Sequence, residues 1–151
     1  MLLRTHLAIS LFFILVCLSS VSSKLIFILF VLIGTIIPDI DSKKSFGGNF
    51  KILRPIQLLF THRGFFHSLL FMVLVLIFLK YVFPVGMFGF FVGFLSHIIA
   101  DIFTIEGIRV FYPFNFKFFG FVKTGELSET LFLLFVVVVD IFLFLFMTIQ
   151  K

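Results

Sequence analysis

Five long apolar runs constrain the fold of this chain more than any other feature of its sequence. Of its residues 62% are hydrophobic and only 13% are charged, whereas an ordinary soluble domain has roughly 25% charged residues. A water-soluble fold could not bury this much apolar surface. We therefore predict an all-α protein: a polytopic helical membrane bundle of about five hydrophobic helices, forming one domain over residues 1–151. The apolar runs cover residues 7–21, 25–37, 68–83, 85–105 and 130–149.

Lysine and arginine residues indicate how the bundle is oriented, because these residues are retained on the cytoplasmic side of a membrane. If the N-terminus is cytoplasmic, only Lys24, Lys80 and Lys151 fall on the outer side. This predicts a multi-pass protein of the cell membrane. The first two runs are short, so they either cross thinned membrane or form a re-entrant hairpin. An alternative makes the N-terminus a secretory signal peptide, whose cleavage would remove His6.

Ionisable side chains inside the apolar runs and at their ends indicate a functional site. A charge at membrane depth costs about 2.5 to 3.5 kcal/mol on insertion scales, so such residues are rarely kept without a role. Each motif alone has a simpler interpretation: a polar helix stop, a hydrogen bond between packed helices, or an N-terminal cap. Their convergence favours a site, because the predicted topology places eight of these residues in the cytoplasmic half of the bundle. They are His6, Asp39, Asp41, His62, His67, His97, Asp101 and Glu129.

The spacing of these residues supports joint binding of a ligand. His97 and Asp101 stand four residues apart and share one helix face. His62 and His67 are five apart and would point about 140° away from each other on a straight helix. Gly64 lets the chain turn between them, so we expect the two rings to converge.

Histidine and carboxylate ligands without a thiolate are typical of Zn²⁺ or Mn²⁺ sites. The single cysteine, Cys17, lies within an apolar run and excludes a cysteine-based zinc knuckle. The ligands outnumber those needed by one tetrahedral ion, which predicts two metal ions. Such sites activate water and stabilise phosphoryl or acyl transition states. Arg63 is a candidate anion clamp, although it also reads as an ordinary loop charge. Asp41 or Glu129 is the candidate general base.

Several motifs together resemble the YdjM-like membrane-bound metal-dependent hydrolases over nearly the whole chain, although that family usually has Thr where this chain has Phe66. The resemblance implies a membrane hydrolase with a metal site. The family is distantly similar to zinc-dependent phospholipase C and P1 nuclease, whose HxxxD helix matches His97 and Asp101. Gly125 stands four residues before Glu129 where those enzymes have a second histidine, which favours two metals over three. The motifs are Thr5-His6, GTIIPDID at 34–41, HRGFFHS at 62–68, GFLSH at 93–97 with Asp101, and Thr124-Gly125 with Glu129.

The predicted function is metal-dependent hydrolysis of phosphoester bonds, including lipid-linked ones, by a metal-activated water at the cytoplasmic face. The partners expected are membrane lipids and a small or lipid-linked anionic substrate. Nucleic acid is not expected, because the basic residues are spread among loops. The alternatives are an ion- or proton-handling transporter, which would also use polar residues of the outer half such as Asp140, and a non-catalytic scaffold or regulatory protein. Gly89 and Gly93 form a small-xxx-small pair that can pack helices within or between chains.

Overall fold

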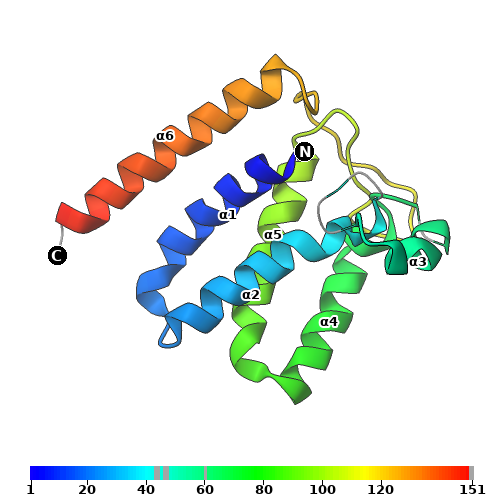
Figure 1. The fold of residues 1–151 in the computed structure, drawn as a ribbon, viewed down its shortest axis with the longest axis horizontal. Coiled ribbons are helices and arrows are strands. Elements are labelled where there is room, and N and C mark those ends of the chain that lie inside the picture. The colour runs from blue at the N-terminus through cyan, green and yellow to red at the C-terminus, as the bar shows by residue number, and fades with distance from the viewer. Residues whose placement is uncertain (43–44, 46–47, 60, 150–151) are drawn as a thin grey trace.

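The computed structural model describes residues 1–42, 45, 48–59 and 61–149, and this part of the chain is an all-α bundle (Figure 1). Five long helices confirm the prediction, and a short sixth helix, α3, lies between the second and third apolar runs. Two isolated bridges are the only β pairings among the described residues. The helices are α1 (Leu3–Cys17), α2 (Lys24–Ile36), α3 (Arg54–Leu59), α4 (Leu69–Val82), α5 (Met87–Ile102) and α6 (Leu127–Ile149).

Helix α1 begins four residues before the apolar run that predicts it. Its first turn is held by Glu129, whose carboxylate accepts hydrogen bonds from the Leu2 amide and the Thr5 hydroxyl. At its other end a 3₁₀ turn, Leu18–Ser20, leads into the serine-rich reversal. His6 therefore lies within the helix, on a face that is fixed relative to α5 and α6.

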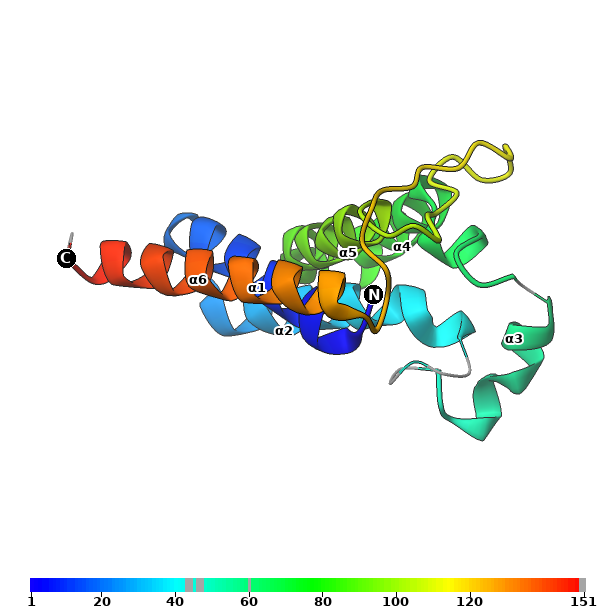
Figure 2. The same cartoon turned by 90° about the horizontal axis from the view of Figure 1, so that it is seen from above.

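Within the described ranges, three helical segments are long and apolar enough to cross a membrane: Leu3–Ser20, Pro84–Ile102 and Leu127–Ile149. Helix α4 is apolar but shorter. Helix α6 lies along the outside of the bundle beside α1, and most of its apolar side chains are exposed (Figures 1 and 2). In water so large an apolar surface would favour aggregation, so these side chains are suited to contact with lipid.

Helices α2 and α5 are packed so closely that their backbones touch. A Cβ atom added to Gly93 would lie 2.0 Å from the carbonyl oxygen of Val31, and one added to Gly34 would lie 2.5 Å from that of Phe90. Small residues allow this approach between membrane helices. The small-xxx-small pair Gly89 and Gly93 thus packs helices within the chain.

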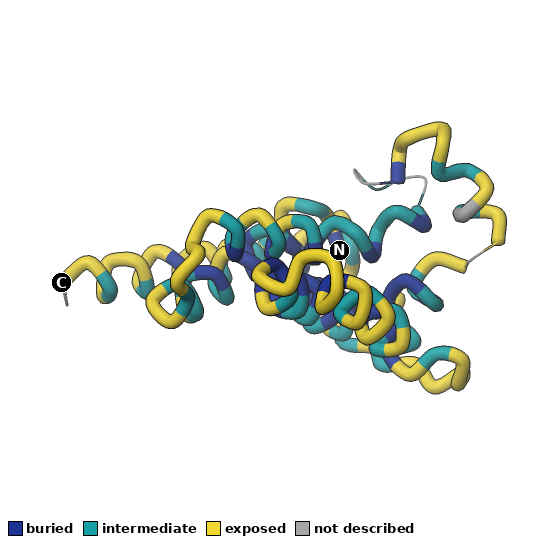
Figure 3. The backbone as a smooth tube through the Cα atoms, turned by 90° about the horizontal axis from the view of Figure 1, so that it is seen from below, coloured by how far each residue is buried: buried dark blue, intermediate teal, exposed yellow. Residues whose placement is uncertain are grey.

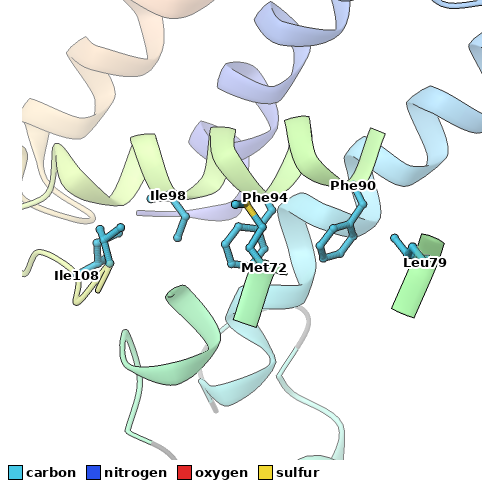
Figure 4. Close-up of a cluster of buried hydrophobic side chains, with 7 residues drawn as sticks. Met72, Leu79, Phe90, Phe94, Ile98 and Ile108 are labelled. Atoms are coloured by element: carbon cyan, nitrogen blue, oxygen red, sulfur yellow. The ribbon is translucent and has the colours of Figure 1, made fainter. Parts of the chain in front are cut away.

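One cluster of buried apolar side chains lies between α4, α5 and the segment that follows α5 (Figure 4). Met72 and Leu79 from α4 meet Phe90 and Phe94 from α5, and Ile108 extends the cluster beyond the end of α5. Figure 3 shows the buried residues gathered in the middle of the bundle, with exposed residues along α6 and on the connections. The segment after α5 is therefore anchored at its base.

Two 3₁₀ turns bring polar residues to one end of the bundle, where α1 and α6 begin and α5 ends. The first turn, Ile37–Asp41, follows α2 directly and contains Pro38, which cannot continue the helical hydrogen bonding. The second, Phe65–His67, precedes α4, whose first turn is capped by the Ser68 hydroxyl accepting from the Phe71 amide. This end of the bundle is called the site end below.

Candidate metal centre

All four histidines and three carboxylates converge at the site end. They come from the start of α1, the turn after α2, the turn before α4 and the last turns of α5. Each offers one ligand atom to a group whose atoms lie within 4.8 Å of one another. We call these seven residues the ligand cluster. The three groups are His6, His97 and Asp101; Asp39, His67 and His97; and Asp41, His62 and His67.

His97 is oriented by the backbone of α2. Its Nδ1 lies 2.7 Å from the carbonyl oxygen of Thr35, and a carbonyl can only accept, so Nδ1 carries the proton. The lone pair of Nε2 therefore faces the cluster, 3.8 Å from an oxygen of Asp101. This contact confirms that the two residues share one helix face. A carbonyl behind the imidazole is the usual support of a metal-ligating histidine.

His67 lies at the centre of the cluster. Its Nε2 is 3.6 Å from Asp39 and 3.5 Å from Asp101, and its Nδ1 is 3.6 Å from Asp41. These separations are too long for good hydrogen bonds. Neighbouring ligand atoms around a tetrahedral zinc ion, with bonds of about 2.1 Å, lie about 3.4 Å apart. The separations thus suit shared coordination better than direct contact.

Several ligand atoms of the cluster are buried without a hydrogen-bond partner among the described residues, which also favours metal coordination. Buried polar atoms are normally hydrogen-bonded, and leaving them without a partner is costly. Burial would lower the pKa of His67, but the carboxylates of Asp39 and Asp41 raise it to about 9. A divalent cation would replace the proton held there. The cluster atoms that have no hydrogen-bond partner in the described part of the chain are both ring nitrogens of His6 and His67, Nε2 of His97 and Oδ2 of Asp41.

His6 stacks on His97 with ring centroids 4.0 Å apart and planes almost parallel. Its Nε2 lies 3.6 Å from the Asp101 oxygen Oδ1. The α-amino group of Met1 donates to the same oxygen at 2.9 Å. The other Asp101 oxygen faces His67 and His97. Asp101 therefore links three histidines from three separate segments.

A buried hydroxyl network that the sequence analysis missed holds α1 against α2 and α5. The Ser10 hydroxyl lies 2.7 Å from that of Thr35 and 2.8 Å from that of Ser96. Ser10 is one helical turn beyond His6, Thr35 is the residue whose carbonyl orients His97, and Ser96 directly precedes His97. This network could have been predicted from the sequence, because Ser10 stands four residues after His6 and Ser96 directly precedes His97.

His62 and His67 converge as predicted, with ring centroids 5.1 Å apart. The chain turns at Gly64, which takes φ −103° and ψ −116° and where a Cβ would lie 2.9 Å from the Thr61 carbonyl oxygen. The left-handed residue of the turn is Arg63, at φ 63°. The amide of Arg109 donates to the Arg63 carbonyl and helps to hold this conformation. His62 lies 2.6 Å from Asp41. Burial raises the pKa of Asp41, but the bond to His62 and the proximity of His67 lower it overall.

Arg63 lies between the ligand cluster and Glu106, an acidic residue outside the cluster. Its Nε is 3.4 Å from Asp101, and its Nη1 is 3.4 Å from Glu106. Glu106 also accepts a hydrogen bond from the Thr124 hydroxyl. The sequence analysis did not select Glu106, because it stands beyond the end of the apolar run with no motif around it.

Glu129 lies outside the three ligand groups. Both of its oxygens accept hydrogen bonds: Oε1 from the Leu2 amide and the Thr5 hydroxyl, and Oε2 from the Gly125 amide. The structure therefore does not bring Glu129 into the cluster as the predicted ligand or base. It holds the start of α1, and hence His6, against α6.

We expect Glu129→Gln to lower the free energy of unfolding by about 2 kcal/mol, because a buried carboxylate that accepts three hydrogen bonds would lose an acceptor. Thermal unfolding in detergent measures this, with the exposed Glu126→Gln as control. Metal content should stay unchanged. Loss of metal at unchanged stability would instead make Glu129 a ligand.

A cavity of about 680 Å³ opens beside the cluster. Asp39, His62 and Arg63 connect it to the ligand cluster, and Arg109 and Lys117 add two further cations to its wall. A recess whose wall contains both candidate metal ligands and cations is suited to an anionic ligand.

A family model described as YdjM inner membrane protein matches residues 1–150. The chain belongs to this family. It is 43% identical over 94 residues to the inner membrane protein YdjM of Escherichia coli, covering 55% of this chain and 47% of the relative. It is 34% identical over 105 residues to the uncharacterized protein YvsG of Bacillus subtilis, covering 66% of each chain. No solved structure matches it.

The family match confirms the resemblance to YdjM proteins stated from the motifs. The chain spans about half the length of the E. coli and Shigella flexneri YdjM proteins that it matches. The name of the YdjM family describes a membrane protein and no reaction, so a hydrolase activity stays a proposal. Seven of the predicted site residues form the ligand cluster, Arg63 borders it, and Glu129 is set apart.

Proposed function

We propose that this chain is an inner-membrane, metal-dependent hydrolase of phosphoester bonds, with its site at the cytoplasmic face. The membrane location is supported by the three apolar spans and by the family to which the chain belongs. The orientation is supported by the excess of lysine and arginine in the connections at the site end.

One observation carries the proposal: buried ligand atoms without hydrogen-bond partners lie beside a cavity bordered by cations. The cluster has the composition of a zinc or manganese site. The cations suit a substrate with phosphate oxygens. A scaffold protein would need neither feature.

The cluster has enough ligands for two ions. If each histidine serves once, one ion is held by His6, His97 and Asp101, and the other by Asp41, His62 and His67. Three protein ligands leave a position open at each ion, as in catalytic zinc sites. Asp39 lies between the two sets, because its Oδ1 faces His67 at 3.6 Å and His97 at 3.9 Å.

Bound divalent metals would supply a water of lowered pKa and positive charge for the phosphoryl oxygens. Arg63 binds a non-reacting phosphate oxygen through the guanidinium that reaches the cavity. Asp39 lines the cavity, whereas the side chain of Asp41 is wholly buried. We therefore assign proton acceptance to Asp39 in place of Asp41 or Glu129. Asp41 orients His62.

The decisive experiment is elemental analysis of the purified protein in detergent. Wild type should hold about two zinc or manganese ions per chain. The double variant His97→Ala, Asp101→Ala should lose at least one of them, because both residues belong to the same group. Circular dichroism should show that the variant remains helical. Metal-loaded wild type is then screened on phosphodiester and phosphomonoester substrates.

Asp140→Asn provides the matched control and tests the transporter alternative. Asp140 is buried in α6 and neither oxygen has a hydrogen-bond partner among the described residues. It lies about 16 Å along the helix from Glu129. A hydrolase should keep its metal in this variant, whereas a transporter that uses both membrane halves should lose ion flux. No metal in wild type after reconstitution would refute the hydrolase and favour a scaffold.

A further inference from the structure

The cavity beside the ligand cluster lies between two connections of the bundle. Between α2 and α4 the lining residues are Ser42, Ser45, Thr61, His62 and Arg63, and between α5 and α6 they are Glu106, Arg109, Lys117 and Thr124. The start of α1 adds the apolar side chains of Met1, Leu2 and Leu3. The cavity therefore has a cationic part, formed by Arg63, Arg109 and Lys117, and an apolar part.

The connection from α5 to α6 carries an unusual number of exposed phenylalanines. We call residues 111–121 the Phe segment. Phe114 and Phe119 are each 72% exposed, and Phe111, Phe116 and Phe121 are also exposed. Lys117 lies among them. The segment projects from the bundle at the site end (Figure 2).

The Phe segment is held in place at its base. The amides of Ile108 and Phe118 each donate a hydrogen bond to the other residue's carbonyl. The Gly120 amide donates to the Thr104 carbonyl. Gly107, at φ 60°, allows the close approach, because a Cβ there would lie 2.2 Å from the Phe118 carbonyl oxygen. The exposed rings therefore stand on an ordered support.

The connection through α3 has the same character. Phe50, Ile52, Leu58 and Leu59 are all exposed, between 63% and 85%, and Lys51 lies beside them. Figure 1 places α3 at the same end of the bundle as the N-terminus and the first turn of α6, and Figure 3 shows both connections as mostly exposed. The two connections that contribute residues to the cavity wall thus both carry exposed apolar side chains outside the cavity.

Exposed aromatic and aliphatic side chains interspersed with lysine and arginine are the signature of a surface that enters the membrane interface. The connection from α5 to α6 joins two helices that are long enough to span the bilayer, and the connection through α3 lies at the same end of the bundle. Placing them at the headgroup level removes their apolar side chains from water. It also brings the cations of the cavity to the level of the lipid phosphates.

We propose that the Phe segment and α3 lie in the headgroup region of an anionic leaflet, and that the cavity between them takes the phosphate-bearing headgroup of a membrane lipid from the side. Arg63, Arg109 and Lys117 bind the phosphate, and Met1, Leu2 and Leu3 contact the apolar part of the same lipid. The reaction that follows rests on the proposed function, whereas the lipid contact does not.

The absence of tryptophan from the chain gives a clean test. Phe114→Trp and Phe119→Trp each create a single reporter in the Phe segment of the full-length protein. The variants are reconstituted in phosphatidylcholine nanodiscs, with or without phosphatidic acid, and either lipid is brominated on its acyl chains. We expect blue-shifted emission, quenching by both brominated lipids, and stronger quenching by brominated phosphatidic acid at equal content.

Charge variants test the headgroup contact. Arg109→Gln with Lys117→Gln, made in the Phe119→Trp background, should abolish the preference for phosphatidic acid. Lys24→Gln with Lys80→Gln removes two cations from the opposite end and should retain it. Leu134→Trp, on the lipid-facing side of α6, provides the reference for complete insertion. Water-exposed, unquenched reporters at 114 and 119 would overturn the proposal, and so would quenching that is equal for both lipids in every background.

A second comparison separates this proposal from the hydrolase. Protein that holds metal and cleaves a soluble phosphomonoester, but fails the quenching test, would refute the lipid site alone. Protein that passes the quenching test but binds no metal would refute the hydrolase alone. If both hold, Phe114→Ser with Phe119→Ser should slow cleavage of phosphatidic acid and leave the soluble substrate unaffected.

Discussion

His67→Ala is expected to lose one of the two metal ions and to reduce hydrolytic turnover by at least about 100-fold, since even residues that only support metal ligands cost 10- to 100-fold. His67 belongs to two of the three ligand groups, and its two nitrogens face Asp39, Asp41 and Asp101 at 3.5 to 3.6 Å. Without it, three carboxylates would face one another with no central base. Elemental analysis and turnover of a phosphomonoester measure the two effects.

His62→Ala is the matched control for this prediction. His62 belongs to one ligand group only, and its side chain is 39% exposed at the edge of the cavity. The His62→Ala variant should therefore bind one ion more weakly and bind the other as wild type does. If His67→Ala protein is folded and still holds two ions, the central role of His67 is wrong and the cluster is held together in another way.

Gly93→Ala is expected to destabilise the bundle by about 3 kcal/mol, at the upper end of the cost of overpacking. The added Cβ would lie 2.0 Å from the Val31 carbonyl oxygen and 2.8 Å from its Cα, so only backbone movement can relieve the clash. Moving α2 away from α5 would also separate the Thr35 carbonyl from His97. We therefore expect a lower thermal midpoint in detergent, together with lower metal content.

Val138→Leu is a suitable control for Gly93→Ala. It also adds volume within a long helix, but Val138 is 63% exposed on α6 and faces outward. Its midpoint should match that of wild type. An unchanged midpoint for Gly93→Ala would mean that α2 and α5 are not in backbone contact in the folded protein.

Much of the site was predictable because ionisable residues are rare in apolar helices. His97 and Asp101 share a face through helical spacing alone, and the distances bear this out. The positions of lysine and arginine placed every histidine on the same side of the predicted membrane. No such rule applies to Glu106, which lies in a connection where a charge has no cost.

The sequence predicted which residues lie at the site better than it predicted what each residue does there. Glu129 carries the same carboxylate as the cluster residues, but both of its oxygens accept hydrogen bonds from the first turn of α1 and from Gly125. Likewise, the turn between His62 and His67 places Arg63 in the left-handed region, which the sequence did not predict. Hydrogen bonds between segments distant in sequence decided both cases.

The sequence by itself determined that the chain is an all-α bundle of apolar helices with histidines and carboxylates at one end. Apolar length and helical periodicity are local properties, and a bilayer leaves few alternatives for a backbone that must satisfy its own hydrogen bonds. Only the tertiary structure decided how the ligands divide into groups, that Asp39 lies between them, and that two apolar connections border the cavity. These features depend on the close crossing of α2 and α5 and on the ordered base of the Phe segment, which are set by contacts between distant residues.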